Sequence, residues 1–436
     1  MNIKGKRVTI VGGKRSGMAL ARLVTALGGK AKISELGPEE SFPHEFRDWA
    51  KQQNVVLECQ GHSRAFVEDS DIVVVSPGVR FDAPPVQWAN ENGTLVLGEV
   101  EFASQFCDKP IIAITGSNGK TTVSTLIRDM IVAAGHKACL CGNIGSPLAG
   151  FVLDLAQTDY VVLEISSFQL ESVLDPVSPF RRASAQDLRV KGFQPHIAVL
   201  LNFNQNHLDR HKDLEEYFQA KMRLFLNQDQ KDFAVLNAQD PKMAEAAKDI
   251  KSWVVYFNTG APGEKARNPN HLAVLEVGRI LGIDDDCCEK VFREFKGVEH
   301  RLESVRCLDG IDFINDSKAT TAEAGMWALQ SLNQPILMIC GGRDKNIDFS
   351  VLSKIVQQKV KRMYAIGEAR KKIRQTFEKL VDLQECSTLE EAVLQARQSA
   401  AKGDCVLLSP MCASFDMFKD YEDRGRVFKD IVRRLT

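Results

Sequence analysis

The sequence predicts an α/β protein that is built on parallel sheets and divided into three domains. Short apolar runs recur along the chain, and each is followed by a segment that can form a helix. This alternation is typical of parallel sheets whose strands are joined by right-handed crossovers. The chain has 436 residues, which is more than one hydrophobic core usually holds. Two glycine-rich turns, each following an apolar run, lie near the starts of the first two domains.

The expected strands are short runs rich in β-branched residues, and this pattern predicts that they are buried. They are Val8–Val11, Asp71–Val75, Ile111–Thr115, Tyr160–Ile165, Ile197–Asn202, Phe233–Asn237, Phe313–Asn315, Ile336–Cys340, Met363–Ile366 and Cys405–Leu408. Thr122–Ala134 is the clearest helix, because its apolar residues recur at helical spacing, and Gly135 is expected to end it.

These elements divide the chain into three segments. The first covers residues 1–108 and contains the first glycine-rich turn. The second covers residues 109–297 and opens just before the second glycine-rich loop. The third covers residues 298–436. The polar stretch Ser178–Lys191 carries four cationic side chains, and we expect it to be a surface insertion.

Composition narrows the class of protein. Hydrophobic residues make up 44% and charged residues 26%, which is ordinary for a globular protein in water. The net charge of −1 provides no field that would draw the whole chain to nucleic acid or to an anionic membrane. No apolar run approaches the roughly 20 residues that a membrane helix needs. The start of the chain lacks the pattern of a signal peptide. We therefore expect a cytoplasmic monomer with no nucleic-acid partner and no membrane insertion.

The eleven cysteines are scattered, and no CxxC pair occurs among them. The histidines do not stand at ligand spacings beside them, so a structural zinc site has no support. We interpret the cysteines as small buried side chains in a reducing compartment.

The strongest local motif is a phosphate-binding loop. An apolar strand leads into the sequence GSNGKTT, which then opens the predicted helix. Glycines allow consecutive backbone N–H groups to face phosphates, and the helix N-terminus adds partial positive charge. The lysine can reach the β and γ oxygens, and the threonine that follows it can ligate Mg²⁺. The residues expected to bind ATP here are Gly116, Ser117, Asn118, Gly119, Lys120, Thr121 and Thr122.

A magnesium ion held at this loop also needs a carboxylate ligand. Glu164 is the natural candidate, because it ends a buried strand at the edge where α/β sheets place ligands. The next strand ends in the polar cluster Asn202–His211, within which His207 can ligate a metal or orient a phosphate.

The motifs together resemble the Mur ligase family, and the resemblance covers essentially the whole chain. The segments that carry it are TGSNGKTT (115–122), GNIGSPL (142–148), VLEISSFQLE (162–171), HLDRH (207–211), QAKMRLF (219–225), GVEHRLE (297–303), INDSKAT (314–320), ICGGRDK (339–345) and LLSPMCASFDMFKDYEDRG (407–425). The SSFQLE and SPMCASFDMF segments resemble the branch of the family that adds D-glutamate.

The resemblance implies a Rossmann-like N-terminal domain, a central P-loop ATPase-like parallel sheet and a Rossmann-like C-terminal domain. It implies an ATP-dependent ligase that joins D-glutamate to UDP-N-acetylmuramoyl-L-alanine through an acyl phosphate, in the synthesis of a peptidoglycan precursor. The implied cofactors are ATP, two Mg²⁺ ions and a carbamylated lysine at Lys221. The metal ligands would be Thr121, Glu164, His207 and Lys221.

The resemblance also assigns the remaining site residues. The substrate-binding positions it implies are Ser16, Glu35, Ser76, Gly78, Asn143, Ser166, Gln169, Thr320, Lys345, Ser414, Phe415 and Tyr421. It adds Asn270, Arg301 and Asp316 to the ATP site. Lys318 joins Lys120, Glu164, His207 and Lys221 as an implied catalytic residue.

Three other interpretations remain open at this point. A sibling amide ligase shares the phosphate loop and differs in its amino-acid pocket. A nucleotide-dependent switch or assembly protein would hydrolyse ATP without needing an amino acid. A nicotinamide-dependent oxidoreductase could be built on the turn Gly12–Gly17, although Lys14 stands where the dinucleotide motif has glycine.

Overall fold

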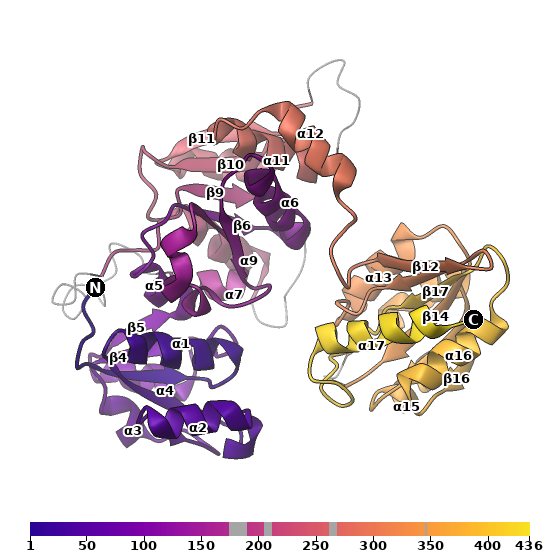
Figure 1. The fold of residues 1–436 in the computed structure, drawn as a ribbon, viewed down its shortest axis with the longest axis horizontal. Helices are drawn as coiled ribbons and strands as arrows, with labels where there is room; N and C mark the ends of the chain where they lie inside the picture. The colour runs from indigo at the N-terminus through magenta and orange to yellow at the C-terminus, as the bar shows by residue number, and fades with distance from the viewer. Residues whose placement is uncertain (174–189, 205–211, 261–267, 345–346) are drawn as a thin grey trace. The chain divides into compact units, whose positions relative to one another are not determined.

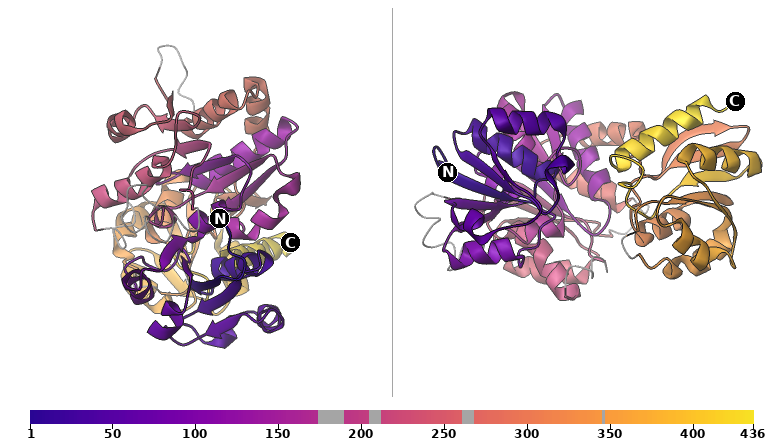
Figure 2. Two further views of the ribbon diagram at one scale, coloured as in Figure 1. Left: turned by 90° about the vertical axis from the view of Figure 1, so that its left-hand side faces the viewer. Right: turned by 90° about the horizontal axis from the view of Figure 1, so that it is seen from below.

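The computed structural model describes residues 1–173, 190–204, 212–260, 268–344 and 347–436 (Figure 1). The chain forms two compact units, Met1–Phe295 and Lys296–Thr436. The first unit holds two sheets and the second unit holds one, with helices on both faces (Figures 1 and 2). The expected α/β architecture is confirmed. The three sheets fall within the three predicted segments, while the domain boundaries themselves stay a prediction.

The first sheet is entirely parallel and has the strand order β3-β2-β1-β4-β5. Its strands are β1 (Arg7–Val11), β2 (Lys30–Ser34), β3 (Val56–Glu58), β4 (Ile72–Val75) and β5 (Leu95–Gly98). Its helices are α1 (Arg15–Ala26), α2 (His44–Gln52), α3 (Arg64–Glu68), α4 (Pro84–Glu91) and α5 (Glu99–Ser104). The strand order reverses between β1 and β4, and a crevice at such a point is where α/β sheets bind ligands.

The second sheet is also parallel, with the order β11-β10-β9-β6-β8-β7. Its strands are β6 (Ile111–Thr115), β7 (Ala138–Gly142), β8 (Tyr160–Glu164), β9 (Ile197–Leu200), β10 (Phe233–Asn237) and β11 (Trp253–Phe257). The helices described around it are α6 (Lys120–Ala133), α7 (Ser167–Leu170), α9 (Leu214–Met222), α10 (Pro241–Ala246), α11 (Pro269–Ile280) and α12 (Asp285–Glu294). Because β8 and β9 flank β6, the loops that follow these three strands share one edge.

The third sheet has the order β12-β13-β17-β14-β15-β16. Its strands are β12 (Glu303–Leu308), β13 (Ile311–Asn315), β14 (Ile336–Gly341), β15 (Val360–Ile366), β16 (Asp382–Glu385) and β17 (Cys405–Leu408). Its helices are α13 (Ala322–Ser331), α14 (Ser353–Lys359), α15 (Arg370–Phe377), α16 (Leu389–Ser399) and α17 (Tyr421–Arg434).

One strand corrects the expectation of purely parallel sheets. β12 pairs with β13 in the antiparallel direction, while the other strands of the third sheet pair in parallel. The two strands are joined by Asp309 and Gly310, which both have positive φ. An Asp-Gly pair with this backbone makes the tight turn of a β-hairpin, so the chain returns along its own path. The third sheet is therefore mixed at one edge.

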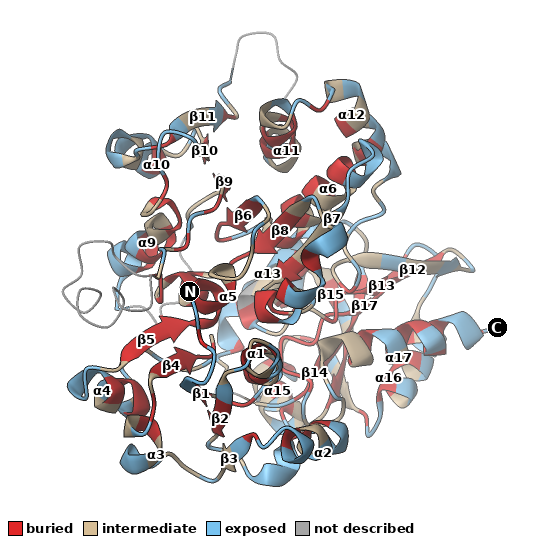
Figure 3. Cartoon of the chain, turned by 60° about the vertical axis from the view of Figure 1, so that its left-hand side comes forward, coloured by how far each residue is buried: buried red, intermediate tan, exposed pale blue. Residues whose placement is uncertain are grey.

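The residues of the central strands are mostly buried (Figure 3). Along β14, Leu337 and Ile339 belong to a different buried cluster from Met338 and Cys340. Successive side chains of a strand point to opposite faces, so both faces of this sheet are covered by helices. Such two-sided burial explains why these strands read as continuous apolar runs in the sequence.

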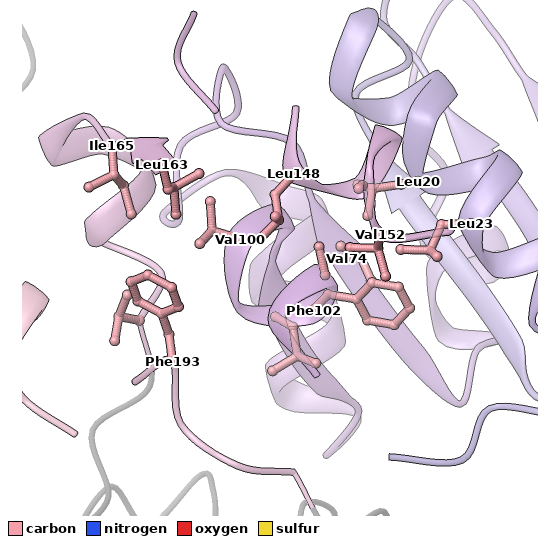
Figure 4. Packing of buried hydrophobic residues seen from close by; sticks show 14 of the residues in the cluster. Leu20, Leu23, Val74, Val100, Phe102, Leu148, Val152, Leu163, Ile165 and Phe193 are labelled. Carbon is pink, nitrogen blue, oxygen red and sulfur yellow. The ribbon is translucent and has the colours of Figure 1, made fainter. Parts of the chain in front are cut away.

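The two sheets of the first unit share one hydrophobic core. A single cluster contains Leu20 from α1, Val74 from β4, Phe102 from α5 and Leu163 from β8, and Figure 4 shows part of its packing. The short 3₁₀ helix η2 (Leu148–Gly150) packs on both α1 and α5. This continuous core makes residues 1–295 one compact unit although they carry two sheets. Among the described residues, no helix is long and apolar enough to cross a membrane.

Candidate active site

The phosphate loop joins the end of β6 to the start of α6. Gly116 has φ +156° and Gly119 has φ +83°, which are conformations that residues with a Cβ rarely adopt. A Cβ atom on Gly119 would also lie 2.6 Å from Oδ1 of Asn270, the second residue of α11. The positive φ therefore favours glycine at position 119, and the side chain of Asn270 lies against the loop.

Hydrogen bonds from the neighbouring strand support the shape of the loop. The Asn118 N–H donates to Oδ1 of Asn202 (2.8 Å), and Nδ2 of Asn202 donates to the Asn118 carbonyl (3.0 Å). The Ser117 N–H donates to the Asn202 carbonyl (3.0 Å). Asn202 follows β9, which lies next to β6. The sequence marked this asparagine only as part of a polar cluster, and the structure shows that it braces the loop.

Lys120 and Thr121 open helix α6. The ammonium group of Lys120 donates to the carbonyls of Gly116 (2.8 Å) and Ser117 (3.1 Å), so the side chain folds back over the loop. Thr121 is buried, and Thr122 is half-buried. This arrangement places one cation and one hydroxyl at the positive end of a 14-residue helix.

Glu164 has one carboxylate oxygen without a hydrogen-bond partner among the described residues, at the same edge of the sheet. The residue ends β8 and is 1% exposed. Its Oε1 accepts from Nδ2 of Asn143 (2.7 Å), whereas its buried Oε2 has no partner among the described residues. A buried oxygen without a partner is costly, and a divalent cation would satisfy it. The chemistry of this donor fits the expected magnesium site.

Helix α9 brings a buried lysine and a tyrosine toward the loop. Lys221 is 1% exposed, and its ammonium group lies 4.6 Å from the ring centroid of Tyr217. The Tyr217 hydroxyl is 3.2 Å from Oγ of Ser117. Burial, together with the charge of Lys120, lowers the pKa of the Lys221 amine well below its usual value. Tyr217 was not expected from the sequence, although its position one helical turn before Lys221 was an available signal.

The first sheet forms a second set of contacts where its strand order reverses. The Ser76 hydroxyl after β4 donates to the Gly12 carbonyl after β1 (2.7 Å). The Gly13 N–H donates to Oε2 of Glu35 (2.5 Å). Ser16 is half-buried in the first turn of α1, and Gly78 is exposed. Four of the implied substrate positions therefore lie on the loops and helix start at one edge of this sheet.

The two sheets of the first unit meet at a narrow cavity. Ser76 lines it from the first sheet, and Gln169 lines it from the start of α7 in the second. Ser166 and Gln169 form a capping box, in which the Gln169 N–H donates to the Ser166 hydroxyl (3.3 Å) and the Ser166 N–H donates to Oε1 of Gln169 (3.0 Å). Glu99 also lines the cavity, and burial raises the pKa of its carboxyl to about 7. The structure thus brings together substrate positions implied for both halves of the unit.

In the second unit, the implied nucleotide residues lie where β12 begins and β13 ends. Oδ1 of Asp316 accepts from the Leu302 N–H (3.2 Å), and its Oδ2 accepts from the Ser409 hydroxyl (2.9 Å). Burial raises the pKa of Asp316 to about 7. The guanidinium of Arg301 lies 5.1 Å from the ring centroid of Trp327.

The implied amino-acid residues lie on the loops that follow β13 and β17. The Lys318 ammonium lies 5.9 Å from the ring centroid of Tyr421, the first residue of α17. Ser414 is buried, Thr320 is half-buried and Phe415 is 56% exposed. Three sequence-based assignments lie outside the described residues, namely His207, Lys345 and most of the insertion 178–191.

The fold and the site define a class of protein. A glycine-rich loop between a central parallel strand and a helix, with a buried acid on the adjacent strand, is the arrangement of a nucleotide-phosphate-binding α/β enzyme.

Comparison with known proteins is more specific. Residues 114–273 match the Mur ligase middle domain, and residues 300–412 match the Mur ligase glutamate ligase domain. A UDP-N-acetylmuramoylalanine–D-glutamate ligase of Koribacter versatilis is 38% identical over 468 residues, which cover 100% of this chain and 99% of that protein. A ligase of the same name from Thermoanaerobacter sp. is 38% identical over the full length of both chains. The chain belongs to the Mur ligase family and is an ATP-dependent ligase.

Solved structures show the same fold at lower sequence identity. A UDP-N-acetylmuramate-alanine ligase from Thermotoga maritima has a TM-score of 0.57 at 18% identity, covering 98% of this chain and 99% of that one. The MurF ligase from Thermotoga maritima, solved in complex with ADP, has a TM-score of 0.58 at 16% identity, with coverage of 93% and 96%. The fold is therefore shared with these ligases.

The buried carboxyl of Asp316 predicts how the stability of the second unit varies with pH. Its pKa is raised from 3.8 to about 7, so the folded state binds more protons than the unfolded state between these values. Stability should therefore fall as pH rises from about 4 to 7, by an amount on the order of a few kcal/mol. Asp316→Asn removes this titration. The melting temperature of the variant minus that of the unchanged protein should therefore increase as pH rises from 5 to about 8.

Thermal unfolding of both proteins across this pH range measures the effect. The matched control is Asp430→Asn, which removes a carboxylate that is 66% exposed on α17 and should leave the pH profile unchanged. If the melting temperatures of the unchanged protein and Asp316→Asn vary with pH in parallel, the raised pKa of Asp316 is contradicted.

Proposed function

We propose that this enzyme forms the amide bond between D-glutamate and the L-alanine carboxylate of UDP-N-acetylmuramoyl-L-alanine, with ATP as the energy source. Two observations at one edge of the second sheet carry the proposal. Asn202 holds the phosphate loop by hydrogen bonds, and one oxygen of Glu164 has no hydrogen-bond partner among the described residues. Its substrate assignment is supported by full-length relatives of 38% identity that bear the name of this ligase.

ATP would bind with its phosphates on the loop that precedes α6. The backbone N–H groups and the start of α6 provide donors for phosphate oxygens. Lys120 would leave the carbonyls of Gly116 and Ser117 and turn to the β and γ oxygens. Asn270 lies against Gly119, so α11 would lie beside the nucleotide proposed to bind there. The solved MurF ligase of the same fold was obtained in complex with ADP, which supports the use of ATP by this chain.

Thr121, Glu164, His207 and Lys221 are the residues we propose for two Mg²⁺ ions. Bound Mg²⁺ would neutralise charge on the phosphoryl oxygens and polarise them. Asn143 holds one oxygen of Glu164 and leaves the other available. The lowered pKa of Lys221 favours the neutral amine, which is the form that combines with carbon dioxide to give a carbamate. A carbamate supplies the anionic oxygen that a metal site needs, whereas an ammonium group would repel the ion.

The reaction would proceed in two steps. An oxygen of the L-alanine carboxylate attacks the γ-phosphorus, the bond to the β-phosphate oxygen breaks, and ADP leaves. Lys120 stabilises the charge that develops on the transferred group. The amine of D-glutamate then attacks the acyl carbon, phosphate leaves, and the amine loses a proton to a base. We expect His207 or a nearby acid to be this base.

The proposed substrate positions divide between the two units. Ser16, Glu35, Ser76 and Gly78 would hold the UDP part, and Asn143, Ser166 and Gln169 would hold the remainder that leads to the reacting carboxylate. In the second unit, Thr320, Lys345, Ser414, Phe415 and Tyr421 would bind D-glutamate. Lys318, Arg301 and Asp316 would act at the nucleotide. Lys345 offers a cation to a carboxylate, and the hydroxyls of Thr320 and Ser414 offer neutral hydrogen bonds.

We further propose that the enzyme works as a monomer in the cytoplasm. All eleven cysteines are free, which agrees with a reducing compartment. Light scattering of the purified protein measures its molar mass, which should be that of a single chain of 48.5 kDa.

Phosphate release tests the reaction directly. The enzyme is supplied with ATP, Mg²⁺ and UDP-N-acetylmuramoyl-L-alanine, and a panel of amino acids that includes both enantiomers of glutamate is compared. We expect release to require D-glutamate, with one phosphate per amide formed. Release with another amino acid would instead identify a sibling ligase, and release without any amino acid would favour an ATP-driven switch.

Lys120→Ala separates catalysis from binding of the UDP substrate. Loss of the cation at the γ-phosphate should lower kcat by roughly 1,000-fold or more. Binding of UDP-N-acetylmuramoyl-L-alanine, measured by calorimetry, should change by less than about threefold because the first sheet is untouched. Arg128→Ala is the control, since Arg128 lies in the same helix and is 38% exposed. Loss of UDP-substrate binding in Lys120→Ala would contradict the division of roles.

Lys221→Arg tests the carbamate. The guanidinium keeps the positive charge and cannot accept carbon dioxide, so kcat should fall by about 100-fold or more. ¹³C NMR of the unchanged enzyme in labelled bicarbonate should show a carbamate signal that Lys221→Arg lacks. Lys242→Arg changes a lysine that pairs with Glu215 on the surface and should retain both the signal and the activity. An unchanged spectrum in Lys221→Arg would rule out this site.

A further inference from the structure

Three cysteines gather on one face of the second sheet. Cys139 and Cys141 stand two residues apart on β7, and Cys107 follows α5. Cys141 belongs to the same core cluster as Leu163 of β8, and both Cys139 and Cys107 pack against that cluster. Alternate side chains of a strand point to the same face, so the thiols of Cys139 and Cys141 are neighbours. Among the described strands, β7 pairs with β8 alone and lies at the edge of its sheet.

The two thiols of β7 have different surroundings. Cys139 is half-buried, whereas Cys141 is buried. A hydrogen bond from the Cys141 thiol to the Cys139 sulfur lowers the pKa of Cys139. The same hydrogen bond, together with burial, raises the pKa of Cys141 well above its usual value. Because the thiolate is the nucleophilic form of cysteine, Cys139 is the thiol of this pair that reacts first.

Other accessible cysteines lack this combination. Burial raises the pKa of Cys107, and its thiol donates to the Lys109 carbonyl (3.6 Å). Cys307 is exposed, yet its hydrogen bond to Asp312 raises its pKa. Exposure alone would therefore rank Cys307 above Cys139, whereas the hydrogen bonds of the two thiols give the opposite order of reactivity.

The geometry of a strand allows the two sulfurs of β7 to be joined. Alternate Cα atoms of a strand lie roughly 6.4–6.8 Å apart, and disulfides span Cα distances of about 4.4–6.8 Å. A disulfide at the upper end of this range is strained and is readily reduced again. An edge strand can adjust to such a bond, because it is hydrogen-bonded to a neighbour on one side only.

We propose that Cys139 and Cys141 form a redox-sensitive pair, which a peroxide oxidises to a disulfide. The Cys139 thiolate attacks an oxygen of hydrogen peroxide, the O–O bond breaks, hydroxide leaves, and Cys139 becomes a sulfenic acid. The Cys141 thiol then attacks the Cys139 sulfur, the S–O bond breaks, and water leaves as the S–S bond forms. The two sulfurs are oxidised, and the peroxide is reduced.

Asn143 connects this pair to the candidate magnesium ligand. It follows Cys141 by two residues. The Asn143 N–H donates to the Glu164 carbonyl (2.8 Å), and its Nδ2 donates to Oε1 of Glu164 (2.7 Å). A disulfide that shortens the end of β7 displaces Asn143 and with it the carboxylate that Asn143 orients. We therefore expect oxidation to lower the ligase activity, and this step alone rests on the proposed role of Glu164.

Peptide mapping of the native enzyme after treatment with hydrogen peroxide tests the chemistry. The tryptic peptide that begins at Ala138 holds both cysteines of the pair. We expect it to lose two hydrogen atoms and to resist alkylation, and dithiothreitol should reverse both changes. In Cys141→Ser, the sulfenic acid should persist on Cys139 and react with dimedone. The proposal is overturned if both thiols of this peptide are still alkylated after peroxide treatment, or if the disulfide joins Cys139 to Cys107.

Cys307 is the internal control, because it is more exposed than Cys139 but has a raised pKa. Iodoacetamide should alkylate Cys139 of the native enzyme roughly fivefold faster than Cys307, or more. Cys307→Ser should leave both the disulfide and the activity unchanged. Alkylation of Cys307 before Cys139 would contradict the assignment of Cys139 as the reactive thiol.

Phosphate release measures the effect on the ligase reaction. Peroxide should lower the activity of the unchanged enzyme by about tenfold or more, and dithiothreitol should restore it. Cys139→Ser should keep its activity within about twofold and should lose the sensitivity to peroxide. If Cys139→Ser does not fold, Cys139→Ala takes its place.

The two readouts separate this proposal from the proposed function. A disulfide that forms without any change in activity would overturn the control of the enzyme by this pair. If the untreated enzyme does not require D-glutamate for phosphate release, the proposed function has failed. The peptide map needs no substrate, so it tests the redox chemistry of Cys139 and Cys141 in either case.

Discussion

The common direction of parallel strands is the constraint on which this molecule depends. When strands run in parallel, their carboxyl ends and the loops that follow them meet at one edge of the sheet. Thr115 and Glu164 end adjacent strands of the second sheet, and Asn315 and Leu408 do so in the third. Residues that are far apart in the sequence are thereby brought together.

Much of the fold could be predicted from the sequence, and all but one of the strands that were missed lie at the edges of the sheets. The expected strands are the central ones, which are buried on both faces and therefore read as continuous apolar runs. The strands at the sheet edges, such as β3, β11 and β16, were not expected, because one side is open and their residues are partly exposed. β2 is the interior exception, since Lys30 and Lys32 interrupt its apolar pattern.

Some residues of the candidate site could be predicted from short sequence patterns, and others only from contacts between distant parts of the chain. Lys120, Thr121 and Glu164 could be predicted because each lies in or next to a strand, loop or helix that a short stretch of sequence indicates. Asn202 and Tyr217 support the loop across the sheet and from a later helix, and their roles depend on contacts that no local pattern records.

The hairpin at Asp309 and Gly310 has a consequence for how the two units are tethered. Because β12 runs antiparallel to β13, its first residue Glu303 pairs with Asn315 at the carboxyl end of β13. The chain that leaves the first unit at residue 295 therefore enters the second unit beside Arg301 and Asp316. Had β12 been parallel, the entry point would lie at the opposite edge, roughly 15–20 Å away across a strand of this length. The hairpin therefore brings the linking chain to the same edge of the third sheet as the loops that follow β13, β14 and β17.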